Sequence, residues 1–143
     1  MRARSKAREI ALFILYQIDI YKRDYKEAFQ NYLEEYPQKD EVVNFSLRLI
    51  EGVLENLEFL DSVIKKYIEN WDIKRLAFID RNILRLSTYE LLFLDDIPPK
   101  VSINEAIELA KRFGDINSSS FVNGILDKIF KSESKKAPSN EKV

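Results

Sequence analysis

The 143-residue sequence contains no cysteine and no histidine. Without cysteine it can form no disulfide, no thiolate zinc site and no cysteine nucleophile. Without histidine it lacks the commonest general base and metal ligand. Glycine occurs only three times, which is too few for a glycine-rich loop that cradles phosphate. Any catalysis would have to use carboxylates and lysines, so the composition argues against an enzyme and against a bound cofactor.

Long apolar runs are also absent. No run approaches the roughly 20 residues that span a bilayer, and the basic N-terminus lacks the apolar core and cleavage site of a signal peptide. Hydrophobic residues make up 45% of the chain and charged residues 33%, which is typical of a soluble globular protein. We therefore expect a cytoplasmic protein that has no membrane contact.

Helical periodicity runs through almost the whole chain. Apolar residues recur at spacings of three and four, and no alternating stretch is long enough to indicate a sheet. The predicted helices begin near residues 5, 25, 40, 61, 72 or 80, 102 and 121. The sequence thus predicts an all-α fold of about seven helices. The most buried helix should end near Leu94, with Arg85 and Glu90 at its edge or paired with neighbouring helices.

Several helix ends have recognisable caps. Ser102 and Glu105 have the spacing of a capping box, and Gly114 stands where a left-handed C-terminal cap is expected. Three further helices should begin with an aspartate cap. The candidates for these caps are Asp40, Asp61 and either Asp72 or Asp80.

The charge distribution is uneven although the net charge is only −1. The first eight residues contain Arg2, Arg4, Lys6 and Arg8 and no acidic residue. Cations at a helix N-terminus oppose the helix dipole, so they do not help this helix to fold. A solvated, frayed helix end is the simpler interpretation, but the density of the cluster favours an anion-binding arm.

A polar loop near the C-terminus is the second candidate. Gly114 opens the sequence GDINSSS, and Phe113 and Phe121 flank it. Single-stranded RNA is read by stacking its bases on aromatic rings, whereas phenylalanine is more often a core residue. From the residues alone, both interpretations of these two rings stay open.

The ordered set of motifs resembles the family of the transcription antitermination factor NusB, over nearly the whole chain. The residues that carry this resemblance are Ala7, Arg8, Glu9, Leu15, Tyr16, Asp80, Ile83, Leu84, Arg85, Tyr89, Glu90, Leu91, Ile97, Pro98, Ile103, Asn104, Glu105, Ala106, residues 110–114, residues 121–124 and residues 126–128.

The resemblance implies two three-helix subdomains and an extra helix. It implies one helical domain over residues 1–130, divided near residue 70 into subdomains of about 1–70 and 71–130. A polar tail over residues 131–143, expected from its composition to be disordered, would follow. The free protein would be a monomer or a homodimer.

The resemblance also implies a function. Members of the family bind the boxA element of nascent ribosomal RNA leaders together with the ribosomal protein NusE, in the antitermination complex of RNA polymerase. The implied RNA-binding residues are Arg2, Arg4, Lys6, Arg8, Phe113, Gly114 and Phe121. The implied NusE-binding residues are Tyr16, Asp80 and Asn117.

Two other functions compete with this one. The chain could be a helical protein–protein adaptor without RNA specificity, in which case the basic arm is only a solvated end. It could also be a metal-assisted hydrolase that uses Asp95 and Asp96, or Asp80, although these aspartates are better explained as caps and helix-end charges.

Overall fold

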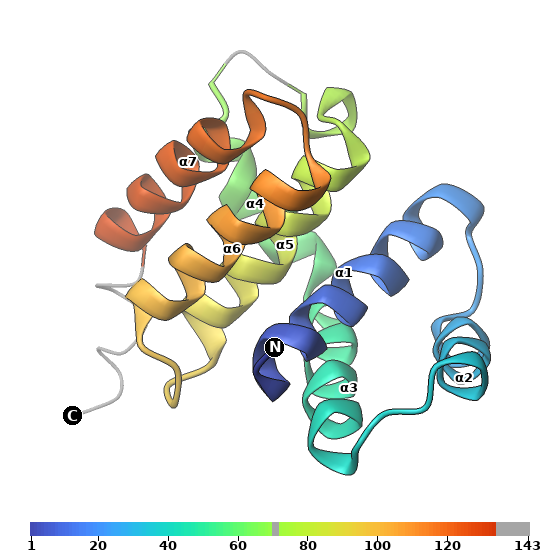
Figure 1. Cartoon of the computed structure of the whole chain (residues 1–143). Coiled ribbons are helices and arrows are strands. Elements are labelled where there is room, and N and C mark those ends of the chain that lie inside the picture. The colour runs from blue at the N-terminus through green and yellow to red at the C-terminus, as the bar shows by residue number, and fades with distance from the viewer. Residues whose placement is uncertain (70–71, 134–143) are drawn as a thin grey trace.

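The computed structural model describes residues 1–69 and 72–133, and within them it contains helices and no strands (Figure 1). The prediction of an all-α fold is confirmed. The helices are α1 (Ala3–Tyr21), α2 (Tyr25–Glu35), α3 (Asp40–Glu55), α4 (Leu57–Tyr67), the 3₁₀ helix η1 (Ile73–Arg75), α5 (Phe78–Phe93), α6 (Pro99–Phe113) and α7 (Ser118–Ser132). None of these helices is both long and apolar enough to cross a membrane.

The first helix lies between the N-terminal helices and the C-terminal helices. Helix α1 packs against α3 on one side and against α5 on the other, and α2 covers its outer side (Figure 1). Ala7, Ile10 and Ile14 of α1 are fully enclosed. A helix that is apolar on more than one face must be covered on more than one face. This explains why the apolar surface of α1 is wider than a single stripe.

The C-terminal half forms its own layer of helices. Helices α5, α6 and α7 pack on one another, and α4 packs against α5 and α7. Because α4 has fewer contacts with α3, the packing favours a subdomain boundary near Asn56, where α3 ends. The division near residue 70 stays a prediction. Helix α7 extends to Ser132, and the rest of the predicted tail, residues 134–143, lies outside the described residues.

The predicted capping box is wrong. Helix α6 begins at Pro99, because proline fits the first position of a helix, where no backbone N–H is needed. Ser102 therefore lies inside the helix. Its hydroxyl donates to Glu90 Oε1 at 2.7 Å instead of capping the helix.

The aspartate caps are only partly right. Helix α3 has Lys39 at its N-cap, so Asp40 is the first helical residue. Asp61 lies in the middle of α4 and accepts hydrogen bonds from Arg85. Asp72 caps η1 by accepting from the Lys74 N–H at 3.1 Å, and Asp80 lies in the first turn of α5.

A buried ion pair joins the N-terminal end of α1 to α5. Arg8 Nε donates to Glu90 Oε2 at 2.7 Å, and Arg8 Nη2 donates to Glu90 Oε1 at 2.9 Å. Ser102 of α6 donates to the same carboxylate, and Glu105 lies 3.7 Å from Arg8 Nη1. Glu90 is therefore paired with neighbouring helices, as expected. The three helices are held in register by one carboxylate that cannot be left unpaired.

A second network joins the other end of α1 to α5. Asp19 accepts from Arg81 at 2.7 Å and from Asn82 at 2.9 Å, and Arg85 lies 3.3 Å away. Burial alone would raise the pKa of the Asp19 carboxyl. The hydrogen bonds and positive charges around it outweigh burial, so its pKa lies below the ordinary 3.8. Arg85 is thus paired as well, with Asp19 and Asp61.

Replacement of Arg8 by methionine should destabilise the protein by about 3–5 kcal/mol, because Glu90 is left as an uncompensated buried charge. The free energy of unfolding in urea measures this. Arg48→Met, which breaks an exposed pair with Asp96, is the control and should cost no more than about 1 kcal/mol. The double variant Arg8→Met/Glu90→Met should recover most of the loss. Equal small losses in both single variants would contradict the role of the pair.

The Asp19 network should make stability depend on pH at the acid end. A lowered pKa in the folded state contributes stability that is complete above the ordinary pKa of 3.8 and is lost as the pH falls through the folded value. Asp19→Asn should therefore be less stable than the wild type at pH 7 and pH 5. The difference should narrow below pH 3.8. Urea unfolding at three pH values tests this, and a constant difference would refute it.

Candidate functional site

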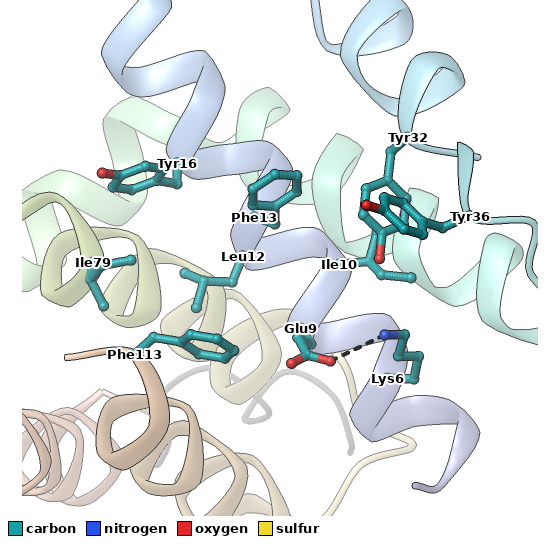
Figure 2. Close-up of a pocket in the computed structure, with 10 residues that line it drawn as sticks. All are labelled: Lys6, Glu9, Ile10, Leu12, Phe13, Tyr16, Tyr32, Tyr36, Ile79 and Phe113. Atoms are coloured by element: carbon teal, nitrogen blue, oxygen red, sulfur yellow. Dashed lines mark hydrogen bonds and ion pairs between the residues drawn. The ribbon is translucent and has the colours of Figure 1, made fainter. Parts of the chain in front are cut away.

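An open groove of about 580 Å³ runs along the exposed side of α1. Its floor is α1 itself, which contributes Lys6, Glu9, Ile10, Leu12, Phe13 and Tyr16. Figure 2 shows Phe113 and Ile79 on one side of α1, and Tyr32 and Tyr36 on the other. The lining is mainly aromatic and aliphatic, so this groove can bind flat or apolar groups.

Phe113 is available for such contacts. It is the last residue of α6, and 42% of its surface is exposed. The Arg112 guanidinium lies 4.9 Å from the centre of its ring. An exposed ring with a cation beside it is a combination that suits a nucleic-acid base.

The charges in the groove are organised by Glu9. Its Oε2 accepts from Arg112 Nη2 at 2.6 Å, and its Oε1 lies 3.4 Å from Lys6 Nζ. Glu9 thereby links the beginning of α1 to the end of α6. One carboxylate in the groove therefore pairs with a cation from each of two helices, with Lys6 in the groove lining and with Arg112 outside it.

The other arginines of the predicted arm do not lie in this groove. Arg2, Arg4 and the buried Arg8 line a second hollow of about 290 Å³. Its lining also includes two carboxylates and an apolar side, namely Glu41, Glu105, Ile97, Pro98 and Val101. The Arg4 guanidinium stands 4.5 Å from the ring centre of Phe45 and 3.6 Å from Asp96. The predicted arm is thus ordered as helix α1 from Ala3 onward and is divided between two hollows.

Arg8 requires a correction. The sequence places it in the anion-binding arm, but in the structure only 3% of its surface is exposed. Its guanidinium is occupied by Glu90, 82 positions away in the chain. Exposure and free hydrogen-bond donors are both needed to bind a phosphate. Arg8 has a structural role in this conformation.

The loop between α6 and α7 is shaped by close contacts. The expected left-handed cap at Gly114 is wrong, since its φ of −90° and ψ of −169° are extended. Glycine is needed for space, because a Cβ here would overlap the Ser118 side chain. Asp115 then orders the loop, accepting from the Asn117 N–H at 2.8 Å. Phe121 follows in the first turn of α7, is half-buried and packs on the core.

The predicted partner-binding residues surround the beginning of α5. Tyr16 meets Phe78 edge to face, with 6.2 Å between the ring centres, and it also lines the groove. Asp80 is close to Ser118 and Asp115, next to the exposed Asn117. The structure therefore brings Lys6, Phe113 and Tyr16 to one groove, with Asp80 and Asn117 at the adjoining loop.

Among the predicted partner-binding residues, Asp80 has a carboxyl group with a perturbed environment. Its Oδ1 is buried and accepts no hydrogen bond within the described residues. Burial raises the pKa of Asp80 above 3.8, the charge of Asp115 adds to this, and the Ser118 hydroxyl opposes it. An unsatisfied buried acceptor is costly. Because Oδ1 is enclosed, a donor from another molecule would have to use the second oxygen of this half-buried residue.

Sequence reasoning missed several groove residues. Arg112 was not selected, because its pairing with Glu9 depends on two helices more than 100 positions apart in the chain. Tyr32 and Tyr36 follow the spacing of an amphipathic helix, which by itself indicates core packing. Phe13 had a usable signal, since it widens the apolar surface of α1 beyond one stripe. Its exposure agrees with that signal.

No group of three or more acidic residues in the described part of the chain is arranged to hold a metal ion. Asp96 is engaged by Arg48 at 3.0 Å. The geometry of the groove is that of a binding surface with aromatic rings, one cation and one carboxylate, and Arg112 pairs with that carboxylate from outside the lining.

Comparison with known proteins places this chain in a family. The sequence model of the NusB family matches residues 5–131. The transcription antitermination protein NusB of Bacillus licheniformis is 52% identical over 126 residues, which are 88% of this chain and 95% of that protein. The NusB of Thermodesulfovibrio yellowstonii is 41% identical over 140 residues, which cover 91% of this chain and 93% of that protein.

Solved structures agree with the sequences. The structure of T. maritima NusB superposes with a TM-score of 0.84 at 43% identity, covering 92% of both chains. A crystal structure of the antitermination factors NusB and NusE in complex with dsRNA superposes with a TM-score of 0.84 at 32% identity, covering 92% of this chain and 98% of that chain. The family match begins in the first turn of α1 and ends in the last turn of α7. The chain therefore belongs to the NusB family.

Proposed function

We propose that this protein is an RNA-binding transcription antitermination factor. It binds the boxA element of nascent ribosomal RNA leaders together with NusE, within the antitermination complex of RNA polymerase. The observation that carries the proposal is the groove, which both Lys6 and the exposed ring of Phe113 line, with the Arg112 guanidinium 4.9 Å from the centre of that ring. A related NusB was solved with NusE and dsRNA, which supports both partners.

The RNA-binding side combines two kinds of contact. Cations neutralise phosphates and release counterions without regard to sequence, and single-stranded bases are distinguished by stacking and by their edges. We assign the first kind to Arg2, Arg4 and Lys6, with Arg112 added. The second kind is assigned to Phe113. Gly114 lets the adjoining loop close, and Phe121 supports it from the core.

The partner-binding side begins where the RNA-binding side ends. Tyr16 lines the groove, and Asp80 and Asn117 lie beside the loop that follows Phe113. RNA and NusE would therefore lie next to each other on one face. This arrangement lets the partner extend the surface that the RNA contacts.

The function is tested by titrating labelled boxA-like RNA and a scrambled RNA of equal length, with and without NusE. With NusE present, the boxA-like RNA should bind more tightly than the scrambled one. Equal weak binding of both RNAs would refute RNA specificity. Binding of NusE with no dependence on RNA would favour the adaptor without RNA specificity.

Lys6→Ala should lower the salt dependence of RNA binding. One lost phosphate contact to single-stranded RNA reduces the slope of log K against log salt by about 0.7. Lys65→Ala is the matched control, because Lys65 is exposed on α4 and lines neither hollow. Titrations at several salt concentrations measure both slopes. A slope unchanged in Lys6→Ala would remove Lys6 from the RNA contact.

Asp80→Asn should weaken NusE binding and stabilise the free protein. Losing a charge-assisted hydrogen bond across the interface weakens binding by about tenfold or more. Because the folded pKa of Asp80 is raised, its ionisation reduces stability as the pH rises above 3.8. The amide removes this loss at pH 7. Calorimetric titration with NusE and urea unfolding test the two effects, and unchanged affinity would contradict the assignment of Asp80.

A further inference from the structure

Glu9 is an anion at the centre of a site that we propose binds a polyanion. Among the residues that line the groove, only Lys6 and Glu9 are charged. Glu9 pairs with Lys6 inside the groove and with Arg112 at its edge (Figure 2 shows the pair with Lys6). A carboxylate here lowers the attraction for phosphate. Phosphate binding therefore does not explain why Glu9 is in the groove.

The carboxylate keeps capacity for a further hydrogen bond. Two carboxylate oxygens offer about four acceptor sites, and Lys6 and Arg112 occupy one on each oxygen. The Glu9 side chain is 18% exposed, so a ligand in the groove can reach it. Arg112 also holds the carboxylate in a fixed position, which reduces the cost of ordering it on binding.

Glu9 and Phe113 are joined through Arg112. The Arg112 guanidinium contacts both of them, bonded to the carboxylate at 2.6 Å and standing 4.9 Å from the ring centre. Arg112 stands over one face of the ring, so a base would stack on the other face. Phe113 and Glu9 line the same groove (Figure 2), so a base in that groove that stacks on the ring has the carboxylate within the same lining. The amino groups of cytosine, adenine and guanine are donors, whereas a phosphate offers only negative charge and acceptors.

We infer that Glu9 is a specificity-determining residue of the RNA site. It accepts a hydrogen bond from the amino group of a base stacked on Phe113, and it repels a phosphate from the same position. This inference rests on the proposed function. An RNA sequence that places an amino-bearing base on Phe113 is bound by both stacking and a hydrogen bond. An RNA that places a phosphate or a base without an amino group there is bound less tightly.

Glu9→Gln tests the inference, because it removes the charge and keeps an oxygen that can accept from Arg112. With NusE present, the scrambled RNA should bind this variant several-fold more tightly than it binds the wild type. Its salt slope should steepen by about 0.7, the value of one added phosphate contact. The boxA-like RNA should not gain, so the ratio of the two affinities should fall. Unfolding in urea verifies that the variant is folded.

Glu108→Gln is the matched control, because Glu108 makes the same kind of ion pair on α6 with Lys111 but is 63% exposed and outside the groove. It changes the net charge equally and should leave the affinity ratio unchanged. If Glu108→Gln lowers the ratio as much as Glu9→Gln does, the effect is one of general charge and the inference is overturned.

A second measurement leaves the protein unchanged. Each amino-bearing base of the boxA-like RNA is replaced in turn by its analogue without the amino group, such as uridine for cytidine or inosine for guanosine. At one position the wild type should lose about tenfold or more in affinity, the cost of a hydrogen bond to a charged group. That loss should become much smaller in Glu9→Gln, because a hydrogen bond to a neutral amide oxygen is weaker than one to a carboxylate. If no position behaves in this way, Glu9 does not read a base.

The outcomes separate this inference from the proposed function. If the wild type does not distinguish boxA-like from scrambled RNA, the proposed function fails and the inference fails with it. If the wild type distinguishes them and Glu9→Gln shifts both affinities by the same factor, the proposed function stands. Glu9 then only positions α6 against α1, and the inference is overturned.

Discussion

The structure depends on buried charges that must find partners across the interface between α1 and α5. Arg8 meets Glu90 near one end of α1, and Asp19 meets Arg81 near the other. Apolar packing along α1 supplies most of the driving force for folding, but it would tolerate small shifts of one helix along another. A buried pair tolerates none, because a displaced partner leaves an uncompensated charge. The ends of α1 are fixed, and the groove along it is fixed with them.

This constraint also sets the geometry of the site. The same turn of α1 that buries Arg8 turns Glu9 and Lys6 toward the groove, because neighbouring residues of a helix point about 100° apart. Helix α6 is tied to this turn directly through Arg112, which pairs with Glu9. It is also tied indirectly through Ser102, which donates to the α5 carboxylate of Glu90 that pairs with Arg8. Phe113 follows Arg112 directly. Its ring is thus held beside α1 by contacts that begin in the core.

The helices could be predicted from the sequence because apolar spacing is a local signal, and α1, α2 and α6 were located to within a few residues. The ends were less predictable. Ser102 has the pattern of a cap, but a proline at the first position of α6 starts the helix three residues earlier. Gly114 was expected for its backbone freedom and is required for the space that Ser118 occupies. Both outcomes depend on neighbouring segments that the local pattern does not contain.

The site was predictable only where a residue's chemistry does not depend on a distant partner. Lys6 and Phe113 were selected from the basic arm and the loop, and both line the groove. Arg8 and Arg112 carry the same charge, but Arg8 is buried in the fold and Arg112 is exposed. A carboxylate from the opposite half of the chain encloses Arg8 in the core, whereas Arg112 is held at the surface by Glu9. Only tertiary structure separates an arginine that holds helices together from one that is available to a ligand.

The first turn of α1 is already folded, and this affects the kinetics of binding. A disordered basic arm would lose about 1–2 kcal/mol of backbone entropy for each residue that it orders on a ligand. Here the backbone from Ala3 onward is already helical and is anchored at Arg8. An arm held in this way reaches less far into solution to capture RNA, but it loses little conformational entropy when it binds. Its contribution should therefore appear mainly as slow dissociation of the complex.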